Sequence, residues 1–504
     1  MPNSQDVLQH IEARQDAYLD ELKDYLRIPS VSTDPAYDED VRRCAHFVRD
    51  QLTSAGLTAE LIETDGHPLV YGEWLGAPGK PTLLFYGHYD VQPPDPLELW
   101  RNDPFEPTVE GDELVARGAT DDKGQSYAHM KAVDALLTTR GRLPINVKFL
   151  IEGEEESGGE AIEKFVRADG GRRLACDAVM VSDSSMFAPG QPSMIYGLKG
   201  LAYMELKVTG PNRDLHSGSF GGAVANPGNA LAHIIAQLRD PTTGRITIPG
   251  FYDDVLPLED WERKEFAALP FDADAYREEL GILELFGEEG YTTHERVWAR
   301  PTCDVNGIFG GYAGEGAKTV LPSWCGAKVS MRLVPNQDPD DIAKRFTEHV
   351  QAVAPPGVTV EVTALHGGHP VLLDASGPLV DAALAGMTEE WQRPVRVREG
   401  GSIPIVSTFH AVLDVPILLI GFGLSDDRLH SPNEKFNLSN YYGGIRAVVR
   451  ILEHMGALDV DAEGAVTTGA GGAGPPRRGD ARKQSEKLNR RGGRAGGPAA
   501  TPHS

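Results

Sequence analysis

The chain has 504 residues, of which 40% are hydrophobic and 24% are charged. This balance is typical of globular proteins and excludes a fibrous or wholly disordered chain. At roughly 100–200 residues per domain, the length predicts two or three domains. The chain has 48 Lys and Arg against 74 Asp and Glu, a net charge of −26. Such a surface repels phosphates, so we expect no nucleic-acid partner.

The cysteines Cys44, Cys176, Cys303 and Cys325 lie far apart in the sequence. This spacing fits neither a disulfide framework nor a thiolate metal site, and it favours a reducing compartment. The N-terminal residues show no apolar core of a signal peptide. The most apolar stretch, residues 415–424, is far shorter than the ~20 residues of a membrane span. We therefore expect a cytoplasmic protein that does not bind membranes.

The spacing of apolar residues predicts a helix over residues 7–25 and another over 41–55. Buried strands are predicted at residues 81–86, 147–151, 178–182 and 417–420. Helices over residues 125–140 and 161–167 lie between these strands. This alternation predicts an α/β sheet, whose site would lie where the strands end.

The pattern changes between residues 206 and 395. Strands with one solvent-facing side are predicted at 203–208, 327–332 and 358–362, and helices at 227–239 and 339–353. We expect residues 206–395 to form a smaller α+β domain, inserted into a catalytic domain made of residues 1–205 and 396–458.

Residues 459–504 differ from both predicted domains, because they are rich in Gly, Pro and Arg. From residue 471 onward this segment carries eight Lys and Arg against two Asp and Glu, so its charge is opposite to that of the body. We expect a disordered tail. On composition alone, an inert extension is favoured over an electrostatic tether.

Polar residues follow the predicted strands or lie in glycine-rich loops: His88 with Asp90, Asp121 with Asp122, the glutamates at 154–156, Asp183 and His430. Carboxylate oxygens and imidazole nitrogens bind divalent metals, and one shared carboxylate can bridge two ions about 4 Å apart. In a His-x-Asp step on an extended chain both side chains face one way, so Asp90 can orient the imidazole of His88. Of the adjacent Glu155 and Glu156, one can bind metal while the other handles protons.

Taken singly, these residues have ordinary structural explanations. A His-x-Asp step is common, a run of glutamates usually faces solvent, and Asp121 with Asp122 could cap the next helix. Their shared placement at strand ends and in glycine-rich loops favours a common site instead.

Five segments carry a family resemblance: residues 87–93 (GHYDVQP), 117–124 (RGATDDKG), 152–158 (EGEEESG), 181–183 (VSD) and 430–434 (HSPNE). In this order they resemble the metal-site segments of the M20 metallopeptidases, and in particular of the carnosinase-like cytosolic nonspecific dipeptidases. The resemblance extends over residues 15–457. It implies a zinc-peptidase-like catalytic domain, a mixed sheet flanked by helices, with an inserted lid and dimerisation domain.

The resemblance also implies two divalent metal ions, Zn or Mn, with Co a third option. The implied ligands are His88 and Asp183 for one ion, Glu156 and His430 for the other, and Asp121 for both. Glu155 would be the general base, with Asp90 beside His88. The peptide bond after Asp121 is expected to be cis. Glu154 stands where the family has an uncharged residue.

Within the inserted segment, residues 214–218 (DLHSG) resemble the part of the family whose histidine, here His216, stabilises an oxyanion in the partner subunit's site. Arg332 matches an arginine that binds the substrate's C-terminal carboxylate, and Ser402 a serine beside it. Thr319 and Asn306 match further substrate contacts. Without the resemblance, Arg332 would be a surface strand arginine and His216 a loop histidine.

These observations predict an enzyme that hydrolyses dipeptides or short peptides as a homodimer. An N-acyl amino acid deacylase is the alternative on the same scaffold, because fold does not separate the two reactions. A noncatalytic metal-binding protein is a remote alternative, since it would be expected to lack a ligand or the base.

Overall fold

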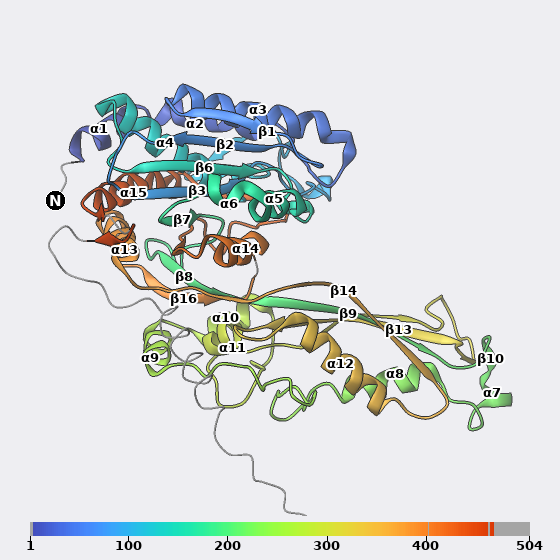
Figure 1. Ribbon diagram of the computed structural model, residues 1–504. Coiled ribbons are helices and arrows are strands. Elements are labelled where there is room, and N and C mark those ends of the chain that lie inside the picture. The colour runs from blue at the N-terminus through green and yellow to red at the C-terminus, as the bar shows by residue number, and fades with distance from the viewer. Residues whose placement is uncertain (1–3, 402, 462–463, 468–504) are drawn as a thin grey trace, which may run out of the picture.

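The computed structural model describes residues 4–401, 403–461 and 464–467. Among these residues, the larger unit is built on a sheet of nine strands in the order β1-β2-β6-β3-β7-β17-β8-β15, with β16 paired to β8 (Figure 1). Strands β6, β3, β7 and β17 are parallel, whereas β1, β2 and β15 join antiparallel. The strand bounds are β1 (Thr58–Ile62), β2 (Leu69–Trp74), β3 (Thr82–His88), β6 (Asn146–Glu152), β7 (Ala178–Val181), β8 (Ser193–Leu198), β15 (Val371–Leu372), β16 (Val395–Glu399) and β17 (Ile417–Leu419).

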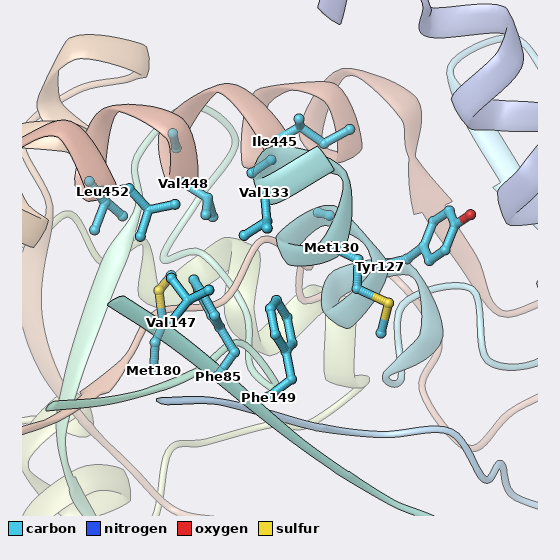
Figure 2. Close-up of a cluster of buried hydrophobic side chains, with 14 of the residues drawn as sticks. Phe85, Tyr127, Met130, Val133, Val147, Phe149, Met180, Ile445, Val448 and Leu452 are labelled. Atoms are coloured by element: carbon cyan, nitrogen blue, oxygen red, sulfur yellow. The ribbon is translucent and has the colours of Figure 1, made fainter. Parts of the chain in front are cut away.

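Helices cover both faces of this sheet, which explains why its central strands are continuously apolar. On one face, Phe85, Phe149 and Met180 pack against α4 and α15 (Figure 2). On the other face, Leu84 and Val179 belong to a cluster with α5 and α14. Burying one such side chain contributes ~1.5–3 kcal/mol. The helices of the two layers are α1 (Gln5–Ala13), α2 (Gln15–Leu26), α3 (Asp38–Ser54), α4 (Lys123–Arg140), α13 (Pro378–Glu390) and α15 (Leu438–Gly456), and α5 (Glu160–Phe165) and α14 (Pro404–Leu413).

A second sheet extends away from the first (Figure 1). Its antiparallel strands have the order β11-β13-β9-β14, and α8 and α12 pack against one face. Strand β8 leads into β9 through Lys199, and β14 leads back to β15 through residues 369–370. The bounds are β9 (Gly200–Thr209), β11 (Asp304–Gly310), β13 (Trp324–Leu333), β14 (Thr359–Gly368), α8 (Pro227–Ala236) and α12 (Pro339–Val353).

Smaller elements complete the described structure. Short sheets pair β10 with β12, and β18 with β5 and β4. Helix α11 packs against α9 and near β16, at the junction of the two units. The bounds are β4 (Thr108–Glu110), β5 (Glu113–Val115), β10 (Leu215–His216), β12 (Val320–Leu321), β18 (Lys435–Asn437), α6 (Gly171–Arg173), α7 (Ser217–Phe220), α9 (Asp260–Ala268), α10 (Ala273–Leu280) and α11 (Thr293–Ala299). Within the described ranges, no helix is long and apolar enough to cross a membrane.

The predicted single helix over residues 7–25 is two helices, α1 and α2. The amide of Arg14 donates to the carbonyl of Ile11, three residues back, at 3.1 Å, which ends the first helix in a tight turn. Buried residues such as Val7 and Tyr18 keep the helical spacing on either side of the break. The spacing therefore indicated helix without showing the interruption.

Strand pairing differs from the predicted boundaries at residues 205 and 395. Strand β9 begins at Gly200, and the segment after residue 370 returns to the larger unit. There β15 and β16 pair with β8, and α13 packs on α15. Periodicity indicates the type of an element but not which sheet it joins. The division into domains, and the lid and dimerisation role of residues 206–395, remain predictions.

The start of the predicted tail is ordered. Strands β19 (Asp459–Val460) and β20 (Val466–Thr467) pair antiparallel, and the amide of Val460 donates to the carbonyl of Gly79 at 3.0 Å. Lys80 adds an ion pair to Asp459 at 2.7 Å. The prediction of disorder was wrong for these residues, because the composition of the whole tail concealed their local contacts. Residues 468–504 lie outside the described structure.

Candidate dinuclear metal site

The polar residues predicted to form a metal site lie at one edge of the larger sheet. His88 is the last residue of β3, and Asp183 follows β7. Glu155 and Glu156 form a short 3₁₀ turn after β6. Because β3, β6 and β7 are parallel, their carboxyl ends meet at the same edge. The parallel pairing thus brings together residues that lie far apart in the chain.

Two groups of side chains converge there and share Asp121. In the first group, the Nε2 atom of His88 lies 3.1 Å from Oδ1 of Asp121 and 4.0 Å from Oδ2 of Asp183. In the second, Nε2 of His430 lies 2.9 Å from Oδ2 of Asp121 and 3.4 Å from Oε2 of Glu156. Within each group, all ligand atoms lie within 4.8 Å of one another. The two oxygens of Asp121 therefore face different groups, as a bridging carboxylate requires.

A buried carboxylate holds the loop that carries Asp121. The Oε1 atom of Glu434 accepts hydrogen bonds from the amides of Thr120 at 3.0 Å and Asp121 at 3.1 Å. Its Oε2 atom accepts from the amide of Gly118 at 3.0 Å and from Arg117 at 2.8 Å. The Asp121–Asp122 peptide bond is cis, as the resemblance implies. Glu434 follows His430 in the sequence, so one side chain joins the loops of both groups.

Asp90 is fully buried and contacts both His88 and the glutamate turn. Its carboxylate lies 3.4 Å from Nδ1 of His88, and its main-chain carbonyl lies 3.1 Å from the same nitrogen. Its Oδ2 atom accepts hydrogen bonds from the amide of Glu156 at 3.0 Å and from the hydroxyl of Ser32 at 2.6 Å. With Nδ1 held in this way, Nε2 of His88 is directed towards Asp121.

The electrostatics of the two groups suit cations. Hydrogen bonds to Asp121 and Glu156 raise the pKa of His430 to about 10. Burial would raise the pKa of Asp121, but hydrogen bonds from His430 and His88 outweigh it and lower the pKa. Burial, and then the charge of Asp121, raise the pKa of Asp183. Carboxylates that stabilise the positive charge of protonated imidazoles can also stabilise divalent cations bound at the same place. The oxygen and nitrogen donor set fits two such ions.

Glu155 lies beside these groups and belongs to neither of them. Burial raises its pKa to about 7, where the nearby His88 acts to lower it and Glu156 to raise it. A carboxyl group with a pKa near neutrality can both accept and return a proton. This is the chemistry expected of a general base that later acts as an acid.

Among the described residues, the predicted substrate-contacting and oxyanion residues do not join the two metal-binding groups. His216 and Thr319 lie together, because the amide of Ser217 donates to the carbonyl of Thr319 at 3.1 Å. Figure 1 shows β10, which ends at His216, and the adjoining α7 at the end of the smaller unit remote from the larger sheet. Asn306 is an exposed residue at a bulge in β11, and Arg332 lies near the end of β13. Ser402 lies outside the described residues.

Sequence reasoning missed two residues with a clear place in the structure. Glu434 was part of a recognised segment, yet its contacts with residues 117–121 depend on loops 313 or more positions apart in sequence. Lys199, between β8 and β9, is a buried lysine whose surroundings come from several segments. The local sequence carries no signal for the loop contacts of Glu434 or for the burial of Lys199.

Two carboxylate and imidazole groups that share one aspartate, at the strand ends of a mixed sheet, define the class of dinuclear metallohydrolases. The chain belongs to the peptidase family M20/M25/M40, whose model matches residues 84–454. The matched residues include the strands and loops that carry all of the candidate metal ligands.

Several known proteins are similar to this chain over most of its length. The Cys-Gly metallodipeptidase of Schizosaccharomyces pombe is 33% identical over 470 residues, which cover 89% of this chain and 97% of the relative. The crystal structure of human carnosine dipeptidase 1 has a TM-score of 0.78 at 30% identity and covers 91% of this chain and 100% of its own. The crystal structure of an M20 family metallo-carboxypeptidase from Sulfolobus solfataricus has a TM-score of 0.77 at 34% identity. It covers 88% of this chain and 99% of its own.

These similarities confirm the predicted family, the mixed α/β fold and the class of enzyme, a metal-dependent peptidase of the dipeptidase kind. They support metal binding in general. The identity of the metal, the roles of individual residues, the cytoplasmic location and the homodimer remain predictions.

Proposed function

We propose that this protein hydrolyses the peptide bond of dipeptides at a site built from His88, Asp121, Asp183, Glu156 and His430. The observation that carries the proposal is the shared aspartate: the two oxygens of Asp121 face separate groups, each with one imidazole and one further carboxylate. Relatives whose names specify dipeptidases are similar over nine-tenths of the chain. Zn or Mn is the expected metal, because this donor set accepts both, and Co is a further option.

Two divalent cations, when bound, would polarise the substrate carbonyl and lower the pKa of water. The protein's own residues supply positioning and proton transfer. Glu155 accepts the proton of the attacking water on its carboxylate and then returns it to the nitrogen of the leaving amine. Asp90 contacts Nδ1 of His88, so Nε2 of the same ring would be free to bind the ion held by His88, Asp121 and Asp183. Arg332 binds the C-terminal carboxylate of the substrate through its forked guanidinium, with Ser402 beside it.

We further propose a homodimer in which the partner subunit supplies His216, to stabilise the oxyanion, with Thr319 and Asn306 as substrate contacts. Within one chain, β10, which carries His216 and pairs with β12 next to Thr319, lies remote from the larger sheet, whose strand ends carry the metal-binding groups (Figure 1). The edge strand β11 and its neighbour β13 expose apolar side chains, including Ile308 at 66% and Trp324 at 41%. Exposed edge strands with apolar side chains are typical of surfaces that pair with another chain.

Two other hydrolytic activities differ from the proposed dipeptidase in the substrates that they cleave. An N-acyl amino acid deacylase would cleave substrates without a free amine, and a carboxypeptidase would cleave longer peptides. The carboxypeptidase is the second candidate function, because the chain is similar to the metallo-carboxypeptidase from Sulfolobus solfataricus at 34% identity.

The test is product release, measured by mass spectrometry, from a panel of dipeptides, tripeptides and N-acyl amino acids. The protein is supplied with Zn or Mn, and a chelator serves as the control. Chelator-sensitive cleavage of dipeptides with a free amine is expected. Cleavage confined to acylated substrates or to longer peptides would replace the dipeptidase proposal by one of the other two activities.

A further inference from the structure

Two cations without an acidic partner lie where the smaller sheet meets the larger one. Lys199 is only 2% exposed, and its Nζ atom donates to the main-chain carbonyl of Arg296 at 3.3 Å. Arg332 is half-buried. Among the described residues, neither side chain forms an ion pair. A buried ammonium ion without a counter-ion is costly, so this pair is expected to serve an anion that enters from solution.

The register of β13 on β9, continued by one residue, places Lys199 and Arg332 towards the same face of the sheet. Arg332 of β13 is directly opposite Leu201 of β9. The paired register ends with Leu333 opposite Gly200, and Lys199 is the residue just before Gly200. Continued by one step, the alternation of the strand puts Lys199 diagonal to Arg332, where Cα separations are typically about 7–8 Å. The alternate residues Ala202 and Met204 face the other way, into the cluster with α8 and α12. The face that carries the two cations is therefore the face without this helical cover.

The electrostatics agree with this placement. Burial, and then the positive charge of Arg332, lower the pKa of Lys199 to about 7, and Arg300 contributes in the same direction. Asp304 opposes them. Other groups occupy both of these neighbours: Arg300 binds Glu288 at 2.8 Å, and Asp304 lies 3.5 Å from Arg239.

The backbone of Lys199 also contacts the segment that contains the predicted serine. Its amide donates to the carbonyl of Gly401 at 3.1 Å, and Gly401 is the residue before Ser402. Lys199 thus lies between the segment beside Ser402 and the strand that carries Arg332. Both of these residues were matched to the substrate's carboxylate, and Lys199 was not.

We propose that Lys199 is a second substrate-binding cation, which acts with Arg332 on the C-terminal carboxylate of the substrate. A carboxylate has lone pairs enough for a forked guanidinium and an ammonium together. A substrate whose C-terminus is an amide offers Lys199 no negative charge, so the site selects peptides that end in a free carboxylate. This inference rests on the proposed function and adds the residue that enforces the preference.

The experiment compares Lys199→Met with the parent enzyme on a dipeptide and on the amide of the same dipeptide, in the presence of Zn or Mn. A hydrogen bond to a charged group contributes enough for a change of about 10- to 100-fold. We expect Lys199→Met to lower kcat/KM for the dipeptide by this factor, mainly through a higher KM. For the dipeptide amide, we expect a change of less than about threefold, because the amide makes no ion pair with Lys199.

Three further variants make the result specific. Lys199→Arg retains a cation and is expected to recover most of the affinity, whereas Lys199→Gln is expected to behave like Lys199→Met. Lys328→Met is the matched control: Lys328 is on β13, is 46% exposed and pairs with Glu205 at 3.9 Å. It is expected to have parent kinetics. If Lys199→Met does not fold, the comparison of Arg with Gln at position 199 decides the question.

The inference is overturned if the variants without the cation lose dipeptide and amide hydrolysis equally, or lose neither. A parent enzyme that cleaves no dipeptide would refute the proposed function instead. In that case, calorimetric titration of the metal-loaded protein with the dipeptide still tests Lys199. Binding that Lys199→Met weakens by tenfold or more supports the inference, and unchanged binding refutes it.

Discussion

The buried carboxylate of Glu434 joins the loops that carry Asp121 and His430, and its replacement by glutamine tests how strongly the site depends on it. Glu434 accepts two hydrogen bonds on each oxygen, one of them from the guanidinium of Arg117. Both side chains of this ion pair are 1% exposed. In Glu434→Gln, one carboxylate oxygen becomes an NH₂ group, which cannot accept either of the two donors that face it.

The expected cost follows from these contacts. Removing one member of a buried ion pair costs ~3–5 kcal/mol, because the remaining charge is left unpaired. Unsatisfied donors cost ~1–3 kcal/mol each, but they belong to the same network and do not add in full. We therefore expect Glu434→Gln to lower the free energy of unfolding of the metal-free protein by ~3–5 kcal/mol. We also expect weaker metal binding, because the loops of both groups lose their common anchor.

The assay is urea denaturation of the metal-free protein, followed by far-UV circular dichroism, together with metal content at a fixed free Zn concentration. Glu110→Gln is the matched control, since Glu110 forms an ion pair with Arg101 at 2.7 Å but both side chains are substantially exposed. Exposed pairs contribute ~0–1 kcal/mol, so the control should unfold like the parent. A loss of less than about 1 kcal/mol in Glu434→Gln, with normal metal content, would show that the anchor is dispensable.

Four further outcomes are expected. Glu155→Gln should retain both metals but lose turnover by ~10²–10⁴-fold, and parent rates in this variant would exclude it as the base. Asp121→Ala should lose metal, as measured by metal analysis after dialysis, and full retention of two ions would exclude a bridging role. His216→Ala should lower kcat by ~10²–10³-fold; mixing it with Glu155→Gln subunits should restore part of the activity, and no restoration would argue against a site shared between subunits. The lowered pKa of Lys199, about 7, predicts that the uncharged amine replaces the ammonium as pH rises through that value. The kcat/KM for a dipeptide should then fall relative to that for its amide, and a constant ratio between pH 6 and 9 would contradict the role of Lys199.

Much of the larger sheet could be predicted from the sequence. The apolar segments before His88, Glu155 and Asp183 are strands β3, β6 and β7. Buried parallel strands are apolar on both faces, so they stand out in the sequence even without a period. The helix at residues 339–353 was predicted with the bounds of α12, because its apolar face, its N-terminal proline and its Asp338 cap are all local features.

Other elements escaped prediction because their partners are distant in sequence. Strand β16, with residues as polar as Arg396 and Glu399, is a strand because it pairs with β8, some 200 positions earlier. The break at Arg14 has no Gly or Pro to mark it. Propensity and periodicity describe one segment at a time, whereas tertiary pairing can override both.

The same distinction applies to the candidate site. The sequence by itself determined the chemistry: imidazoles and carboxylates after apolar strands, in an order that indicates the family. Only the tertiary structure showed that the two oxygens of Asp121 face separate groups, that Glu434 joins both loops, and that Lys199 lies near Arg332 without an acidic partner in the described chain. Residue types depend on local sequence, but distances and unpaired charges depend on strand register and loop closure between segments hundreds of residues apart.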